Sequence, residues 1–84
     1  MYQEDMRELE RLIARRREMR AKLADSCDRR KAAKERGDEK TIMRERIKAA
    51  YCTNFITRLN DEIFALGKAL GVDPEELGAA EDTH

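Results

Sequence analysis

Residues 42–70 carry a continuous seven-residue repeat, which constrains the fold more than any other feature of the chain. Two positions of the repeat, three residues apart, are apolar or a thiol at every occurrence except Glu45. This spacing predicts a helix with one apolar seam, and such a seam has to be covered by another helix. The two positions are occupied by Ile42, Ala49, Ile56, Ile63 and Leu70, and by Glu45, Cys52, Leu59 and Leu66.

The composition favours helical architectures. The chain has 84 residues, enough for one small domain, and 43% of them are charged while only 5% are aromatic. Such a mixture is too polar for a compact globule with a deep core and is typical of long helices or coiled coils. Intrinsic disorder is the competing interpretation for so charged a chain, and the sustained repeat argues against it except at the two ends.

A further helix is expected upstream of the repeat, over about residues 4–36. Glu4 and Asp5 place negative charge in its first turn, and neither Pro nor Gly interrupts it before Gly37. Gly37 and Asp38 then predict a tight turn between antiparallel helices, with Asp38 capping a helix over about 39–70. The apolar residues of the upstream helix recur at steps of three and four: Met6, Leu9, Leu12, Ile13, Met19, Leu23 and Cys27.

The register of this hairpin follows from a turn centred on residues 37–38. It places Leu23 near Cys52, Met19 near Ile56, and Leu12 near Ile63.

The downstream helix is expected to end at Gly71, in a left-handed cap. Asp73 and Pro74 then predict a short helical turn over 73–77, followed by a flexible acidic tail over 78–84. Residues 1–77 are therefore expected to form a single helical-hairpin domain.

A second apolar stripe lies beside the repeat, formed by Met43, Ile47, Tyr51 and Phe55, with Phe64 further along. Two apolar faces on one helix imply two neighbours, whereas a hairpin supplies one. We therefore expect an all-α fold in which two hairpins dimerise into a four-helix bundle. The expected core of this bundle consists of Leu9, Leu12, Met19, Leu23, Ile42, Cys52, Ile56, Leu59, Ile63, Leu66 and Leu70.

The sequence offers few groups for catalysis or for binding a metal or cofactor. Its one histidine is His84, and its four glycines form no phosphate-binding loop. Cys27 and Cys52 are too few and too far apart for a disulfide scaffold or a zinc site. We expect a protein that is not an enzyme and has no catalytic, cofactor-binding or metal site.

The first residues, MYQEDMRELE, lack the apolar core of a secretory signal, and no apolar run approaches the ~20 residues of a membrane helix. These features predict a cytoplasmic protein without a membrane partner.

Two functions remain open. The first is a protein-interaction or regulatory module, acting as an adaptor, inhibitor or assembly subunit through the stripe of Met43, Ile47, Tyr51 and Phe55. Aromatic side chains often dominate interface energies, although the same stripe equally suits the homodimer core.

The alternative is a nucleic-acid-binding bundle. Residues 11–36 hold eleven Lys or Arg against four Asp or Glu, and Arg15, Lys22 and Arg29 fall in one row of the helix. The scarcity of aromatic side chains weighs against the stacking of bases. The candidate phosphate-binding residues are Arg15, Arg16, Lys22, Arg29, Arg30 and Lys34.

Overall fold

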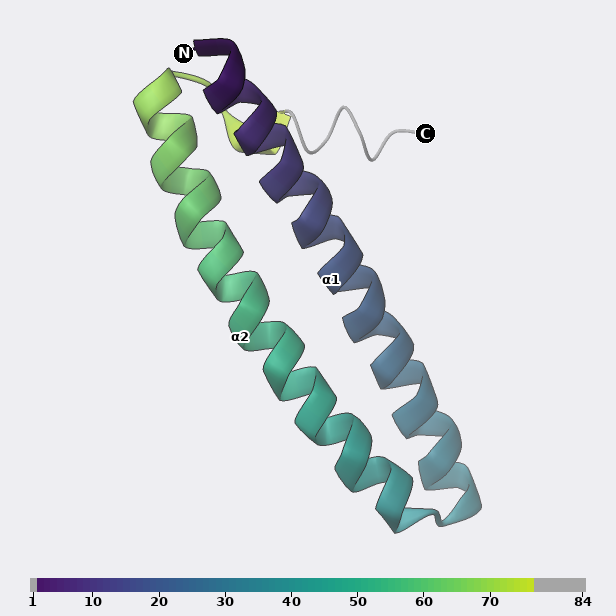
Figure 1. Ribbon diagram of the computed structural model, residues 1–84. Coiled ribbons are helices and arrows are strands. Elements are labelled where there is room, and N and C mark those ends of the chain that lie inside the picture. The colour runs from purple at the N-terminus through teal and green to yellow at the C-terminus, as the bar shows by residue number, and fades with distance from the viewer. Residues whose placement is uncertain (1, 77–84) are drawn as a thin grey trace.

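The computed structural model describes residues 2–76 and contains two long helices that pack side by side as an antiparallel hairpin (Figure 1). Helix α1 spans Tyr2–Arg36 and helix α2 spans Glu39–Leu70. A helical turn over 74–76 follows α2 and lies at the open end of the hairpin, near the start of α1. The rod measures 52 × 25 × 15 Å. The all-helical hairpin expected from the heptad repeat is therefore confirmed.

The ends of the helices are defined by short-range contacts of the kind that the sequence implies. Asp38 caps α2 by accepting a hydrogen bond from the Thr41 backbone N–H at 3.2 Å, and the Thr41 hydroxyl donates to the same carboxylate at 2.6 Å. These two bonds hold the pKa of Asp38 below its ordinary value. At the other end, Gly71 adopts φ 71°, a left-handed conformation that costs glycine little. Helix α1 begins slightly earlier than expected.

The core is a single layer of side chains between α1 and α2. Its main buried cluster consists of Leu9, Ile13, Met19, Cys52, Leu59 and Ile63, and Ala33 and Ala49 are buried as well. A second group packs against them but remains half-buried: Leu12, Leu23, Phe55, Ile56, Leu66, Leu70 and Val72. Ile42, near the turn, is half-buried as well. The residues expected in a bundle core thus lie at the α1–α2 interface, and many of them keep an uncovered side.

The turn after α2 folds back onto that helix. Asp73 caps it by accepting a hydrogen bond from the Glu75 backbone N–H at 3.0 Å. Its Pro74 ring lies so close to Gly67 that a β-carbon on Gly67 would come within 2.5 Å of Pro74 Cγ. The last residue of the turn expected over 73–77, and the whole of the tail expected over 78–84, lie outside the described residues.

None of the helices in the described part of the chain is both long enough and apolar enough to cross a membrane.

Candidate functional site

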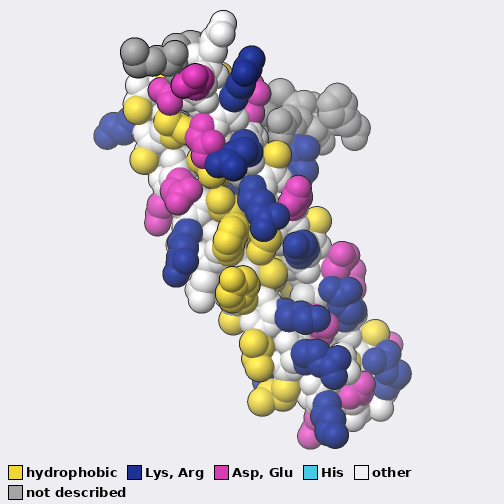
Figure 2. Space-filling model, viewed as in Figure 1, with side chains coloured by type: hydrophobic (Ala, Val, Ile, Leu, Met, Phe, Trp, Pro, Cys, Tyr) yellow, Lys and Arg dark blue, Asp and Glu magenta, His cyan; other side chains and the backbone are white. Residues whose placement is uncertain are grey.

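Large apolar side chains are exposed along one face of α2. Met43 is 59% exposed, Ile47 70% and Tyr51 69%, although each is large enough to fill a core position. Figure 2 shows hydrophobic side chains running along the middle of the visible face, with Lys and Arg side chains beside them on the α1 side. Contiguous apolar patches of this kind mark interaction sites more often than isolated exposed residues do.

Ile47 and Tyr51 of this stripe line an open groove between the helices, which we call the central groove. The groove has a volume of about 580 Å³. Ile47, Tyr51 and Phe55 line its α2 side, and the row of Arg15, Lys22 and Arg29 lines its α1 side; Met19, Ser26, Lys48 and Cys52 complete it. The sequence placed the apolar stripe and the basic row on separate helices, and the fold brings them to the same groove.

The basic wall is held in place by contacts within the hairpin. The guanidinium of Arg15 lies 5.5 Å from the centre of the Phe55 ring, within range of a cation–π interaction. Arg15 Nη1 also donates to Glu18 Oε2 at 2.9 Å. Phe55 is consequently half-buried, while Ile47 and Tyr51 project beyond it. The groove therefore offers a fixed cation over one aromatic ring and exposed apolar groups on its opposite wall.

A buried polar cluster lies at the turn side of the groove. Glu45 is 3% exposed, and its Oε2 accepts a hydrogen bond from Ser26 Oγ at 2.9 Å. Arg29 Nε and Lys48 Nζ lie 3.4 and 3.6 Å from Glu45 Oε1. The Ser26 hydrogen bond, helped by the charges of Lys48 and Arg29, lowers the pKa of the Glu45 carboxyl despite its burial. Glu45, the polar exception in the heptad repeat, is thus ionised and fully paired.

Arg16, one of the candidate phosphate-binding residues, does not lie on the surface beside Arg15. Its side chain is buried, because Nη1 donates to Asn60 Oδ1 at 2.8 Å and lies 3.5 Å from Glu75 Oε1. The expectation that Arg16 contacts phosphate with its neighbours is therefore corrected: its guanidinium ties α1 to α2 and to the C-terminal turn.

Phe64 also departs from expectation, because it does not continue the apolar stripe. It is 71% exposed and borders the hollow formed by Arg16, Asn60 and Pro74.

The remaining cations of the candidate nucleic-acid site gather near the turn. Arg30 and Lys34 of α1, with Lys31, face Arg46 of α2 across a hollow of about 400 Å³ that is also lined by Cys27, Asp28 and Ile42. Arg30 Nη2 lies 3.5 Å from the Cys27 sulfur. The six candidate residues are thus split between the central groove, this basic hollow and the buried Arg16.

Within residues 2–76, His, Cys, Asp and Glu side chains nowhere gather in a group of three that would suit a metal ion. Every buried side-chain nitrogen or oxygen of this part of the chain has a hydrogen-bond partner.

No family model, no curated protein and no solved structure matches this chain. Its function is therefore inferred from the fold and from these surfaces.

Three residues between the helices and the C-terminal turn had no role in the sequence-based description of the site. Ser26, which is 2% exposed, donates a hydrogen bond across the helices to Glu45, and Asn60 accepts one from Arg16. Glu45 and Arg16 are charged residues at apolar positions of their helices. Gly67 receives the Pro74 ring. The available signal was the charge itself: Glu45 within the repeat and Arg16 on the apolar face both required a buried polar partner.

Proposed function

We propose that this chain is a cytoplasmic, non-catalytic protein-interaction or regulatory module, an adaptor, inhibitor or assembly subunit, that acts as a homodimeric four-helix bundle. The observation that carries the proposal is the exposure of Ile47 and Tyr51, at 70% and 69%, along one side of the central groove, with Met43 exposed further along the same helix. Burying each of these side chains in an interface would stabilise the assembly by about 1.5–3 kcal/mol.

The incomplete core of the hairpin supports the same proposal. Leu12, Leu23, Leu66 and Leu70 pack against the buried residues but remain half-buried. A second hairpin would add a further layer over such residues, as in four-helix bundles.

Sedimentation equilibrium of the wild type and of two matched variants tests the proposal. Ile47→Asn and Phe64→Asn each remove one large apolar side chain of nearly equal exposure, 70% and 71%, but only Ile47 lines the central groove. We expect a dimeric wild type, and dissociation at least about a hundredfold easier for Ile47→Asn, because the lost burial counts twice in a symmetric dimer. Phe64→Asn should dimerise like the wild type. A wild type that sediments as a folded monomer at every concentration would refute the homodimer.

Nucleic-acid binding is the second candidate, favoured by the basic hollow in which Arg30, Lys31, Lys34 and Arg46 meet. A gel-shift series at rising salt tests it, because each phosphate contact releases counterions and steepens the loss of affinity with salt. Replacing Lys22, Arg30 and Lys34 by Gln should abolish a specific shift. The absence of a shift at low salt excludes this candidate.

A further inference from the structure

The hairpin is electrically polarised along its length. The half nearer the turn, residues 22–52, carries ten Lys or Arg against six Asp or Glu. The rest of the described chain, residues 2–21 and 53–76, carries eight against ten. Because the helices are antiparallel, these segments form the two ends of one rod, so a basic end and an acidic end lie on opposite sides of the central groove.

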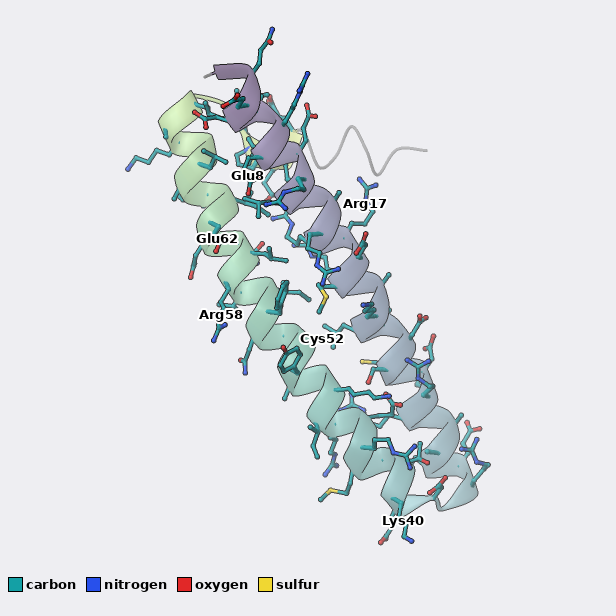
Figure 3. All side chains as sticks on the ribbon, viewed as in Figure 1. Glu8, Arg17, Lys40, Cys52, Arg58 and Glu62 are labelled. Carbon is teal, nitrogen blue, oxygen red and sulfur yellow. The ribbon has the colours of Figure 1, made fainter. Side chains whose placement is uncertain are left out.

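The exposed face of α2 shows the same polarity. Lys40 and Arg44 lie toward the turn, while Asp61 and Glu62 lie toward the open end beyond Arg58, and all five are exposed. Figure 3 shows Lys40 at the turn end of α2, Cys52 near the middle and Glu62 toward the opposite end. The apolar residues Ile47 and Tyr51 fall between Lys40 and Glu62. This face matches a second copy best when that copy is reversed.

We propose that the central groove is occupied by α2 of a second copy of this chain, running antiparallel, with the two-fold axis near Tyr51. This inference rests on the proposed homodimer and specifies its orientation and contacts. With the axis at this point, Lys40 of each copy lies opposite Glu62 of the other, because both are eleven residues from Tyr51, while Arg44 faces Arg58. A parallel dimer would instead place basic end on basic end and acidic end on acidic end, which like-charge repulsion disfavours.

The centre of this interface is apolar. Residues equally far from Tyr51 face each other in an antiparallel pair, so Ile47 of one copy meets Phe55 of the other, and the two Tyr51 rings lie near the axis. The segment from Lys40 to Glu62 spans about 33 Å at ~1.5 Å per residue, well within the 52 Å length of the rod. The second copy therefore fits the groove in apolar contact and length, and Lys40 meets Glu62 at both ends of the contact.

Charge reversal at Lys40 and Glu62 tests the orientation. Lys40→Glu and Glu62→Lys each create two like-charge pairs in the antiparallel dimer, and we expect each to raise the dissociation constant about tenfold. The double variant restores both pairs with reversed sign, and its dissociation constant should return to near the wild-type value. In a parallel dimer each of these positions faces its own counterpart, so no rescue is expected. Circular dichroism checks that each variant keeps its helices.

Spin-label distances give an independent measurement. A single label at Lys40→Cys, in a Cys27→Ala, Cys52→Ala background, should give a separation of about 33 Å along the antiparallel dimer, because each label lies eleven residues from the axis at ~1.5 Å per residue.

The outcomes separate the two proposals. A dimer with adjacent labels and no rescue in the double variant overturns the antiparallel orientation and leaves the homodimer standing. A monomeric wild type overturns both and leaves the groove to a different protein.

Discussion

At the scale of single residues, Glu45 is the clearest case of a polar group that the apolar seam accommodates. It occupies a buried position of the heptad seam although it is charged, and its side chain is almost entirely removed from solvent. Ser26, Arg29 and Lys48 surround it at 2.9–3.6 Å. Burial of an unpaired carboxylate would be costly, so these contacts are what allow a charged residue at this position.

Stability should therefore depend on pH through Glu45. Its pKa in the folded chain is lowered below the ordinary value of 4.5, chiefly by the Ser26 hydrogen bond, so the unfolded chain binds the proton more readily. The stabilisation is present above pH 4.5 and is lost as pH falls through the folded pKa. Glu45→Gln should unfold at lower urea than the wild type at neutral pH, and this difference should shrink as pH falls below that value.

Glu8 and Asp38 also have lowered pKa values, because of hydrogen bonds from Arg11 and from Thr41 respectively, so the wild type alone cannot isolate the contribution of Glu45. The informative quantity is the difference between the wild type and Glu45→Gln at each pH. A difference that stays constant from neutral to acid pH would contradict the assignment. Ser26→Ala gives a second measure, because without the hydroxyl the pH dependence assigned to Glu45 should weaken.

Residue patterns predicted buried apolar positions better than buried polar ones. Leu9, Leu59 and Ile63 follow from helical spacing, since such spacing depends only on the helix that carries it. The burial of Arg16 depends on Asn60 of α2 and Glu75 of the terminal turn, which are distant in sequence. A long cationic side chain on an apolar face can either reach solvent or find a partner, and only the fold decides between these outcomes.

At the scale of elements, the contact between α2 and the C-terminal turn depends on a glycine within the helix. A β-carbon on Gly67 would lie 2.5 Å from Pro74 Cγ and 3.2 Å from the Val72 carbonyl oxygen. We expect Gly67→Ala to destabilise the hairpin by about 1–3 kcal/mol, the usual range for overpacking, even though alanine is the better helix former.

A double-mutant cycle in urea separates this clash from other effects. Pro74→Ala removes the ring atoms nearest to the new methyl group, so Gly67→Ala should cost close to nothing in that background, leaving a coupling of about 1–3 kcal/mol. Equal costs of Gly67→Ala in both backgrounds would mean that the ring does not pack on α2.

The two helices and their connection could be predicted from the sequence because local chemistry determines them. The heptad spacing defines α2, and Asp38 and Gly71 mark its ends. The central groove could not be predicted in the same way. Its two walls come from different helices, and Arg15 covers Phe55 only in the register that the folded hairpin adopts.

At the scale of the whole molecule, the hairpin is a thin rod whose interior is one layer of side chains, with an apolar groove near its middle and opposite charge excess at its ends. A small core of this kind gives limited stability by itself. Association through the groove would add apolar burial and charge pairing at once, which joins the stability of the fold to the proposed function.

The proposed charge pairing would make the dimer sensitive to salt, with a sign specific to the antiparallel arrangement. The Debye screening length falls from about 10 Å at 0.1 M salt to about 3 Å at 1 M, which weakens attraction between exposed charges such as Lys40 and Glu62. We expect the wild-type dissociation constant, measured by sedimentation equilibrium, to rise by about 3–10-fold over this range of KCl. In Lys40→Glu the same positions repel, so salt should tighten that dimer. Phe64→Asn, which leaves the charges unchanged, should follow the wild type. A wild type and Lys40→Glu that respond to salt in the same direction would contradict the pairing of these two ends.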